Sequence, residues 1–398
     1  MVVKTLSKDD LWCSVLGGAA LATGGGGANP TYEAFSKDVD PIFESGLKPQ
    51  LIDSKDLSDT GPILVPIGIG GGIMREDQER YGPPVRGGPY IEIAFREMDR
   101  VFPLLKGAKI QGDAWRQAAI ERLKEIKGDS KYIAHFAGEI GPGIYRQAVS
   151  GAGEGVPVVD ADMAGQRAVP ELCFTSFNVK QLPATPVVIA TVWGDMLVFE
   201  KSLSWQRLED ISRAIAIVSG GFNSTVMSVK GRDIKESAVQ GSYSKAIKVG
   251  KAIKEANESG DDPVEKIVEA TKGYKIFEGE IVARTTEGKS AFLWGDCWIK
   301  GTGDFDGKLF RFWYKNENQI SWLDGEPYVT CPDPFTVIDS RTGEGLSNFR
   351  AEAWTQCRKV AVVGVKAVDI WRTERGLKIY NPRHFNFDMP YRPIEEIM

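Results

Sequence analysis

Carboxylates and a guanidinium gather in one short stretch of this chain. Apolar residues at 156–159 predict a buried strand, and Asp160 and Asp162 stand at its carboxyl end. A glycine-containing turn then leads to Arg167 and Glu171. Charges at the end of a hydrophobic strand are costly to bury unless they are paired or bound to a ligand. The stretch therefore predicts either a catalytic or ligand site or an internal salt-bridge cluster.

The two interpretations give these residues different partners. In the salt-bridge interpretation, Arg167 pairs with Asp160 or Glu171 and fixes a junction between domains. In the functional interpretation, the carboxylates face a ligand, because ligands of open α/β sheets collect at the carboxyl ends of strands. Both stay open at this point, since structural ion pairs resemble functional sites in sequence.

A second strand is expected to bring a further carboxylate to the same place. Residues 132–136 predict a strand that ends just before Glu139, and residues 144–152 predict a helix leading into the next strand. A strand, a helix and a parallel strand in this order place both carboxyl ends at one sheet edge. We therefore expect Glu139 to lie beside Asp160 and Asp162.

Such a carboxylate set suits hydrolysis. A carboxylate can act as the general base for water, or several can hold a divalent metal that lowers the pKa of bound water. We predict Glu139, Asp160 and Asp162 as catalytic residues and as metal ligands, with Arg167 and Glu171 orienting them. The expected cofactor is a divalent metal, zinc or manganese, and no nucleotide or flavin is expected. The chain has only two histidines, which excludes a three-histidine zinc site within it.

A glycine run near the start is the second candidate site. Gly24, Gly25, Gly26 and Gly27 are followed closely by Asn29. Backbone N–H groups of such a run can bind an anion, whereas tight packing of helices is the alternative, and both stay open. The run is neither a P-loop nor a Rossmann fingerprint, because no Lys-Ser/Thr follows it and no strand precedes it. We predict that these five residues contact the substrate.

Composition limits the class of protein. With 398 residues, 42 % hydrophobic and 26 % charged residues, the chain is typical of a globular protein of two or three domains. A net charge of −5 without a basic stripe argues against nucleic acid binding, and no apolar run reaches membrane-spanning length. The start of the chain lacks a signal peptide pattern, so a cytoplasmic location is expected. Five scattered cysteines without a CxxC pair argue against a disulfide framework.

The order of the predicted elements indicates an α/β N-terminal domain, 1–172, with a mostly parallel sheet. A mixed, β-rich C-terminal domain, 173–398, is expected to follow, with a sub-boundary near 274 where short strands begin to dominate. Further strands are predicted at 63–69, 174–179, 186–192 and 196–203. Helices are predicted at 11–21, 31–39, 91–105, 114–126, 210–217, 243–256 and 263–271.

Four groups of motifs carry a family resemblance over nearly the whole chain. They are LGGAALATGGGGANP, then EIG with VPVVDADMAGQRAVPEL, then GGFNSTVMS with GSYSKAIKVGKAI, and finally YKNENQISW, CPDPFTVIDSRTGE and NPRHFNFDMPY. In this order they resemble the S-methyl thiohydantoin desulfurase-like family, formerly a family of unknown function. The sequence departs from the usual family pattern at DADMAGQRAVPE, at EIGPGI and at NPRHFN, all in expected site loops.

The resemblance implies an activity and partners. The family name implies hydrolysis of an S-methylated thiohydantoin ring to a hydantoin with loss of methanethiol, which breaks a C–S bond in a five-membered ring system. Arg383 and His384, in a tail motif, are predicted to complete the substrate site, with a structural role as the alternative. The other function class is a non-catalytic accessory subunit of a hydantoinase/oxoprolinase-like complex. A homo-oligomer is expected from the base rate for enzymes. The ten tryptophans support the same expectation, since four of them are candidates to face a partner: Trp313, Trp322, Trp354 and Trp371.

Overall fold

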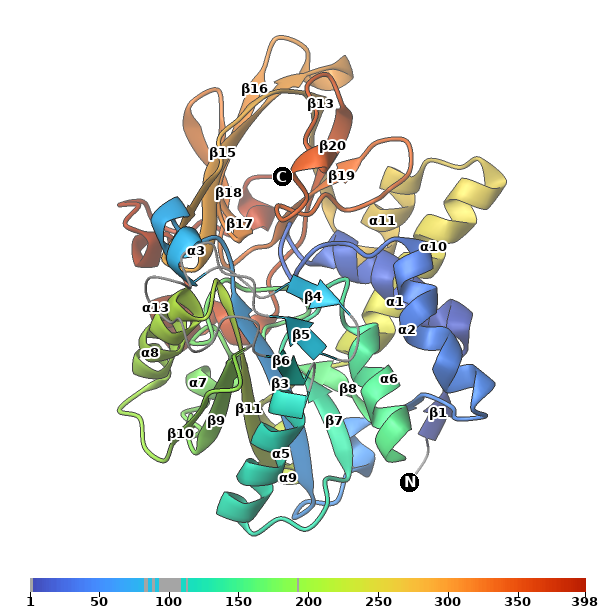
Figure 1. Ribbon diagram of the computed structural model, residues 1–398. Coiled ribbons are helices and arrows are strands. Elements are labelled where there is room, and N and C mark those ends of the chain that lie inside the picture. The colour runs from blue at the N-terminus through green and yellow to red at the C-terminus, as the bar shows by residue number, and fades with distance from the viewer. Residues whose placement is uncertain (1–2, 82–84, 88–89, 93–108, 112–113, 192) are drawn as a thin grey trace.

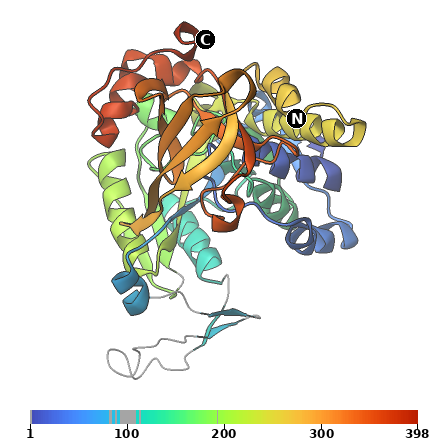
Figure 2. The same ribbon diagram turned by 90° about the horizontal axis from the view of Figure 1, so that it is seen from above.

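The computed structural model describes residues 3–81, 85–87, 90–92, 109–111, 114–191 and 193–398. Two large sheets dominate it, one above the other in Figure 1. Seen from above, the second sheet lies over the middle of the molecule, between the C-terminal segment in red and the helices in yellow (Figure 2).

The first sheet has nine strands and is mixed, with a parallel run at its centre. Its order is β1-β2-β8-β7-β3-β11-β9-β10, with β12 beside β8. Strands β2, β8, β7 and β3 are mutually parallel neighbours, which confirms the predicted α/β domain with its strand–helix–strand unit. The strands are β1 Val3–Thr5, β2 Gln50–Ile52, β3 Pro62–Gly70, β7 Ala134–Ala137, β8 Val158–Asp162, β9 Val187–Thr191, β10 Met196–Phe199, β11 Phe222–Lys230 and β12 Val239–Gln240.

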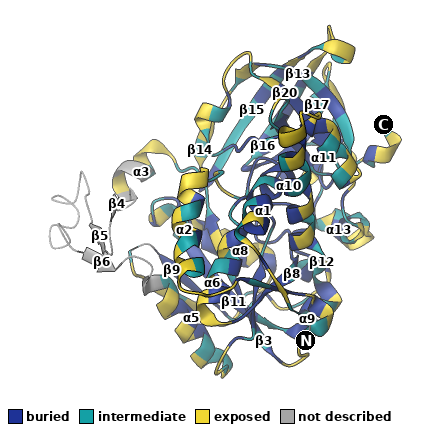
Figure 3. Cartoon of the chain, turned by 90° about the vertical axis from the view of Figure 1, so that its right-hand side faces the viewer, coloured by how far each residue is buried: buried dark blue, intermediate teal, exposed yellow. Residues whose placement is uncertain are grey.

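Helices cover this sheet and reach up to the second one. They are α1 Lys8–Leu21, α2 Tyr32–Glu44, α3 Arg75–Tyr81, α5 Ala114–Lys127, α6 Tyr145–Glu154, α7 Ser176–Val179, α8 Trp205–Val218, α9 Gly231–Ser237, α10 Ser242–Ser259 and α11 Pro263–Thr271. Ser7 and Asp10 form a capping box at the start of α1, so this helix begins directly after the capping residue in the sequence. In Figure 3, α1 lies buried beside α10, whereas α2 and α5 show exposed outer faces. In the part of the chain that is described, no helix has both the length and the apolarity needed to cross a bilayer.

Two predicted elements come out differently. The strand predicted at 174–179 is the short helix α7, whose first turn is capped by Thr175 Oγ1, 3.1 Å from the N–H of Phe177. A short buried apolar run fits a helix or a strand equally well, and here the threonine cap decides. Of the helix predicted at 91–105, residues 93–105 lie outside the described residues, and 91–92 belong to β5 Tyr90–Glu92. This strand pairs with β4 Val85–Gly87 and β6 Lys109–Gln111 in a small third sheet.

The second sheet has eight strands and is antiparallel in every pairing described, with a strong curl. It contains β13 Tyr274–Arg284, β14 Glu287–Lys289, β15 Phe292–Gly301, β16 Leu309–Lys315, β17 Glu317–Leu323, β18 Glu326–Thr330, β19 Phe335–Asp339 and β20 Lys359–Gly364. The helices α12 Asp369–Arg372 and α13 Glu374–Ile379 follow it. The predicted β-rich C-terminal part is thereby confirmed. Strands β9 to β12 belong to the first sheet and β13 opens the second, so the boundary placed at 172 stays a prediction.

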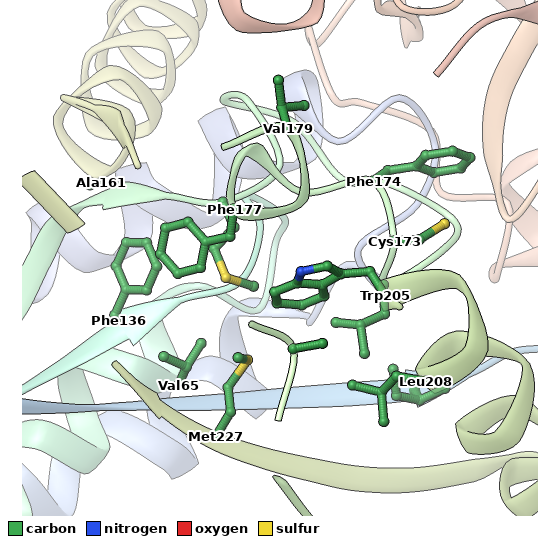
Figure 4. Packing of buried hydrophobic residues seen from close by; sticks show 14 of the residues in the cluster. Val65, Phe136, Ala161, Cys173, Phe174, Phe177, Val179, Trp205, Leu208 and Met227 are labelled. Carbon is green, nitrogen blue, oxygen red and sulfur yellow. The ribbon is translucent and has the colours of Figure 1, made fainter. Parts of the chain in front are cut away.

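The two faces of the first sheet are packed by different elements. Figure 4 shows Val65 of β3, Phe136 of β7 and Met227 of β11 packed together on one face, under Phe177 and Trp205. Because side chains alternate along a strand, the neighbouring residues of the same strands face the other side. The first face is therefore a filled core, and on the opposite face Leu64 and Val226 pack against Leu123 of α5.

Cys173 and the tryptophans belong to the interior. Cys173 lies in the core cluster of Figure 4, and burial raises the pKa of its thiol well above the ordinary value. Trp354 and Trp371 are buried, and Trp313 and Trp322 pack against Phe387. These tryptophans stabilise the chain itself, so they offer no support for a partner surface, and the homo-oligomer stays a prediction.

Candidate functional site

A cavity of about 1530 Å³ lies at the carboxyl ends of β3 and β7 and is lined further along by residues of α5 and α6. Residues from both large sheets line it. They include Gly26 and Gly27 of the glycine run, Gly70 and Gly71 at the end of β3, Glu139 after β7, Glu171 after β8, Arg213 of α8 and Glu317 of β17. Ligands are expected at such an edge, and two of the predicted catalytic residues, Glu139 and Glu171, reach it.

Glu139 stands just beyond β7, where the sequence places it. Its Oε2 accepts a hydrogen bond of 2.9 Å from the N–H of Val169, which fixes the carboxyl group. Burial, with a smaller contribution from the negative charge of Asp162, raises the pKa of Glu139 to about 7. The group thus changes its charge near neutral pH, which is what a general base requires.

Glu317, at the start of β17, faces the same cavity from the second sheet. It is 3 % exposed, and its Oε1 accepts a hydrogen bond of 3.2 Å from the N–H of Gly26. Its Oε2 is buried and has no hydrogen-bond partner among the described residues. Burial and the negative charge of Glu139 raise the pKa of Glu317 well above its ordinary value. Two neighbouring buried carboxyls cannot both ionise readily, so the pair retains a proton at neutral pH.

The glycine run packs closely against Glu317 where the two domains meet. A Cβ at position 25 would lie only 1.7 Å from Glu317 Oε1, so only glycine allows this approach. The carbonyls of Thr23 and Gly24 accept hydrogen bonds of 2.7 Å from the N–H groups of Asn318 and Asn348. The run therefore packs against β17, and its N–H at position 26 serves a carboxylate of the protein itself.

Of the five residues of this loop that were predicted to contact the substrate, two line the cavity. Gly26 and Gly27 line the cavity, whereas Gly24 and Gly25 are not among its lining residues. Asn29 points elsewhere, because its Nδ2 donates to the carbonyl of Gly345 at 2.8 Å and so ties the loop to the second domain.

Asp160 and Asp162 lie within β8 instead of beyond it, and their carboxylates accept hydrogen bonds from neighbouring parts of the chain. Asp162 is fully buried and accepts hydrogen bonds from Ser242 Oγ at 2.7 Å and from the N–H groups of residues 164, 165 and 166. Asp160 accepts from the N–H of Ser244 at 2.8 Å, in the first turn of α10. Burial raises the pKa of Asp162 to about 6, against the effect of these hydrogen bonds. Neither residue is among those lining the cavity.

These residues do not fit a metal centre. The carboxylate oxygens of Asp160 and Asp162 already accept hydrogen bonds from Ser244 and Ser242, and those of Asp162 from three backbone N–H groups as well. Across the residues that are described, no three His, Cys, Asp or Glu side chains are grouped so as to hold a metal ion. The divalent metal stays a prediction, and no step below depends on it.

Arg167 joins the domains and, among the described residues, pairs with no carboxylate. It is 1 % exposed and donates to the carbonyls of Ala168 at 3.0 Å and Pro332 at 2.9 Å, with its guanidinium 5.2 Å from the ring centre of Tyr380. The pairing with Asp160 or Glu171 that the sequence suggested is not found. Arg167 does link the two domains, but it does so by hydrogen bonds to carbonyl oxygens of both domains and not by an ion pair.

Glu171 is an anion at the cavity wall. It pairs with Lys315 Nζ, and His384 Nε2 lies 3.0 Å from its Oε2. Burial alone would raise its pKa, but the hydrogen bond with His384 and the charge of Lys315 prevail and lower it to about 2. His384 thus reaches the site through Glu171, whereas Arg383 is exposed and pairs with Asp388 at 3.2 Å.

Glu317 was not predicted, although the sequence carries a signal for it. Residues 316–319 read Asn-Glu-Asn-Gln, and all four are at least 96 % buried. A polar run inside a module of otherwise apolar strands indicates a network or a site. Lys315, directly before this run, was missed as well.

Comparisons with known proteins agree on the family. The family model described as "S-Me-THD-like, N-terminal domain" matches residues 9–201, and "S-Me-THD-like, C-terminal domain" matches residues 203–394. The crystal structure of a protein from Chromobacterium violaceum is similar with a TM-score of 0.68 at 17 % identity, covering 98 % of this chain and 100 % of that one. At this identity the likeness supports the fold alone, and no curated protein matches. The two family models cover almost the entire chain, which therefore belongs to the S-methyl thiohydantoin desulfurase-like family.

Proposed function

We propose that this protein hydrolyses a C–S or C–N bond of a small five-membered ring, with an S-methyl thiohydantoin as the first candidate substrate. The observation that carries the proposal is the pair of buried carboxyls, Glu139 and Glu317, facing one cavity from two domains. Two neighbouring carboxyls with raised pKa values that share a proton can serve as base and acid in the same reaction. Membership of the family supplies the substrate class.

The proposed reaction uses one group for each proton. Ionised Glu139 takes a proton from a water molecule, whose oxygen forms a bond to the ring carbon that carries sulfur while the electron pair of the ring C=N bond moves to nitrogen. That pair forms the C=N bond again as the C–S bond breaks, and protonated Glu317 gives its proton to the leaving sulfur. The products are methanethiol and a hydantoin, which forms as the remaining hydroxyl proton moves from oxygen to the ring nitrogen. A proton passing from Glu139 to Glu317 restores the pair. Glu139 is assigned as the base because the N–H of Val169 favours its ionised form, and Glu317 as the acid because its buried Oε2, without a hydrogen-bond partner among the described residues, favours the protonated form.

Arg213 provides a fixed positive charge beside the pair. Its guanidinium lines the cavity, forms an ion pair of 2.8 Å with Glu209, and donates to the carbonyls of Gly70, Pro170 and Ala291 at 2.8–3.0 Å. Groups held this firmly do not reorganise during a reaction, which favours stabilisation of developing charge.

Turnover of S-methyl thiohydantoins by the purified protein tests the proposal. Methanethiol is measured with a thiol reagent and the hydantoin by chromatography. We expect Glu139→Gln and Glu317→Gln to lower kcat by about 100-fold or more, the usual contribution of general acid–base groups. Asp160→Asn is the matched control and should stay within about twofold of the unchanged protein, since general acid–base losses are far larger. Full turnover in both glutamine variants would refute the assignment.

Two untested expectations are settled by the same preparation. Elemental analysis for zinc and manganese tests the predicted metal, with Asp160→Ala as the second sample. Inertness of the protein alone, together with stable co-purification of a hydantoinase-like protein, would favour the accessory-subunit alternative over the hydrolase.

A further inference from the structure

The edge strands of the two large sheets differ in how they are protected. An edge strand offers unpaired N–H and C=O groups to another chain, and charged residues or proline usually prevent such pairing. The edge strand β1 carries Lys4, β18 carries Glu326 and Pro327, and β19 is largely buried. The remaining edge of these sheets in the described part of the chain is β10, which reads Met-Leu-Val-Phe without charge, proline or bulge. This edge is open to pairing.

Strand β10 also exposes apolar side chains at the end of the first sheet, on the lower left in Figure 1. Met196 is 41 % exposed and Val198 is 37 % exposed, and Leu203, four residues beyond the strand, is 91 % exposed. Single exposed apolar residues are ordinary, but a row of them along an unpaired edge marks a contact surface. Among the described residues, β9 is the strand that pairs with β10, on its inner side.

The backbone of β10 shows which groups face the open side. The carbonyl of Asp195 accepts a hydrogen bond of 3.0 Å from the N–H of Thr191, so Asp195 and every second residue after it face β9. Met196, Val198 and Glu200 therefore turn their N–H and C=O groups outward. Within the part of the chain that is described, none of these groups has a hydrogen-bond partner. The open side thus offers a ladder of donors and acceptors to a further strand.

We propose that β10 pairs with β10 of a second copy of this chain, antiparallel, about a two-fold axis at Val198. In an antiparallel pair, residues that lie opposite each other both turn their N–H and C=O groups toward the partner strand or both turn them away. The axis therefore passes through a residue and not between two. With the axis at Val198, this residue lies opposite its own copy, and Met196 lies opposite Glu200. The two first sheets then become one continuous sheet, and the exposed side chains of Met196 and Val198 are shielded from water.

Charges beside the strand select this register. Asp195 and Lys201 are both exposed, and neither forms an ion pair among the described residues. An axis at Val198 places Asp195 of each copy opposite Lys201 of the other, so two pairs of opposite charge form by symmetry. An axis at Leu197 would instead put Asp195 opposite Phe199, and an axis at Phe199 would put Lys201 opposite Leu197. Opposite charges across strands stabilise a pairing, and like charges destabilise it.

Analytical ultracentrifugation of the full chain measures whether this pairing forms. We expect the unchanged protein to be a dimer or a larger assembly of even number. Val198→Lys places two ammonium groups side by side at the axis and should raise the Kd of the dimer by at least about tenfold. Val282→Lys is the matched control, because Val282 of β13 is 39 % exposed, and this variant should keep the Kd within about twofold.

An exchange of charges tests the register itself. In a dimer of Asp195→Lys, or in one of Lys201→Glu, positions 195 and 201 carry like charges. Each variant alone should therefore raise the Kd by at least about tenfold. Mixed in equal amounts, the two variants should form a heterodimer with a Kd within about threefold of the unchanged protein, because each position 195 again meets an opposite charge at position 201.

Three results would each overturn the pairing. They are a monomeric unchanged protein, a Kd that Val198→Lys does not change, and a mixture of the two charge variants that associates no better than either alone. Asp195→Lys also removes the acceptor of Thr191 Oγ1, so circular dichroism is recorded to show that each variant is folded. Recovery of the dimer in the mixture requires both variants to be folded, and loss of structure therefore does not produce the expected result.

Discussion

At the scale of single residues, burial and a like charge act together on Glu139 and Glu317. A carboxyl whose pKa is raised in the folded protein stays protonated where the unfolded chain has already lost the proton. The folded state is therefore destabilised as pH rises from about 4.5, the ordinary value, through about 7, the value for Glu139. Glu317→Gln removes one ionisable group and the repulsion of the pair.

We expect Glu317→Gln to raise the free energy of unfolding at pH 8 by about 1–3 kcal/mol, since each pKa unit corresponds to about 1.4 kcal/mol. At pH 5 the variant and the unchanged protein should differ less. Urea unfolding at both values measures this, with the exposed Glu326→Gln as control. A stability gain that is equal at both pH values would mean that the ionisation of Glu317 has no part in it.

At the scale of elements, Asp160 and Asp162 connect β8 to the first turn of α10. Asp162→Ala leaves Ser242 Oγ and the N–H groups of residues 164–166 without their acceptor in a buried place. We expect a loss of about 3–5 kcal/mol, as for other broken buried charge networks. Asp160→Ala removes an exposed cap of Ser244 and should cost about 0.5–2 kcal/mol.

Chemical denaturation measures both losses, and turnover per folded molecule is the second readout. A structural role predicts that folded Asp162→Ala still hydrolyses the substrate at a comparable rate. If Asp162→Ala were as stable as the unchanged protein but inactive, the aspartate would belong to the catalytic machinery after all.

At the scale of the whole molecule, Arg167 links the sheets through carbonyl oxygens of both domains. Arg167→Met keeps much of the side-chain volume but leaves the carbonyl of Pro332 without its donor. We expect a loss of about 1–3 kcal/mol, the cost of a buried group without a partner. Thermal unfolding should also separate into two transitions if this junction couples the domains.

Arg383→Met is the matched control, because that arginine is exposed and holds only Asp388 among the contacts described. A surface substitution of this kind should stay within about 0.5 kcal/mol. Equal effects of the two arginine variants would show that the junction does not depend on Arg167.

Much of the fold is determined by local pattern. Apolar runs with defined ends predicted β3, β7, β8 and β9, and the capping residues and helical spacing predicted α1, α5, α10 and α11. The strand–helix–strand rule then placed Glu139 at the correct sheet edge, because the carboxyl ends of parallel strands lie at the same edge. Where the pattern was short and apolar, as at 174–179, local sequence could not choose between helix and strand.

The chemistry was decided by tertiary structure. Glu317 and Glu139 line one cavity because the folded chain brings β17 beside the glycine run and the end of β7, which are far apart in the sequence. Asp160 and Asp162 carry the stronger sequence signal, yet their carboxylates accept hydrogen bonds from serines of α10, which are 84 and 80 residues further along the chain. Sequence alone identified Glu139 and Glu171 and the strands that precede them, but not Glu317. Which carboxyls face the cavity depends on partners that only the folded chain brings within hydrogen-bond distance.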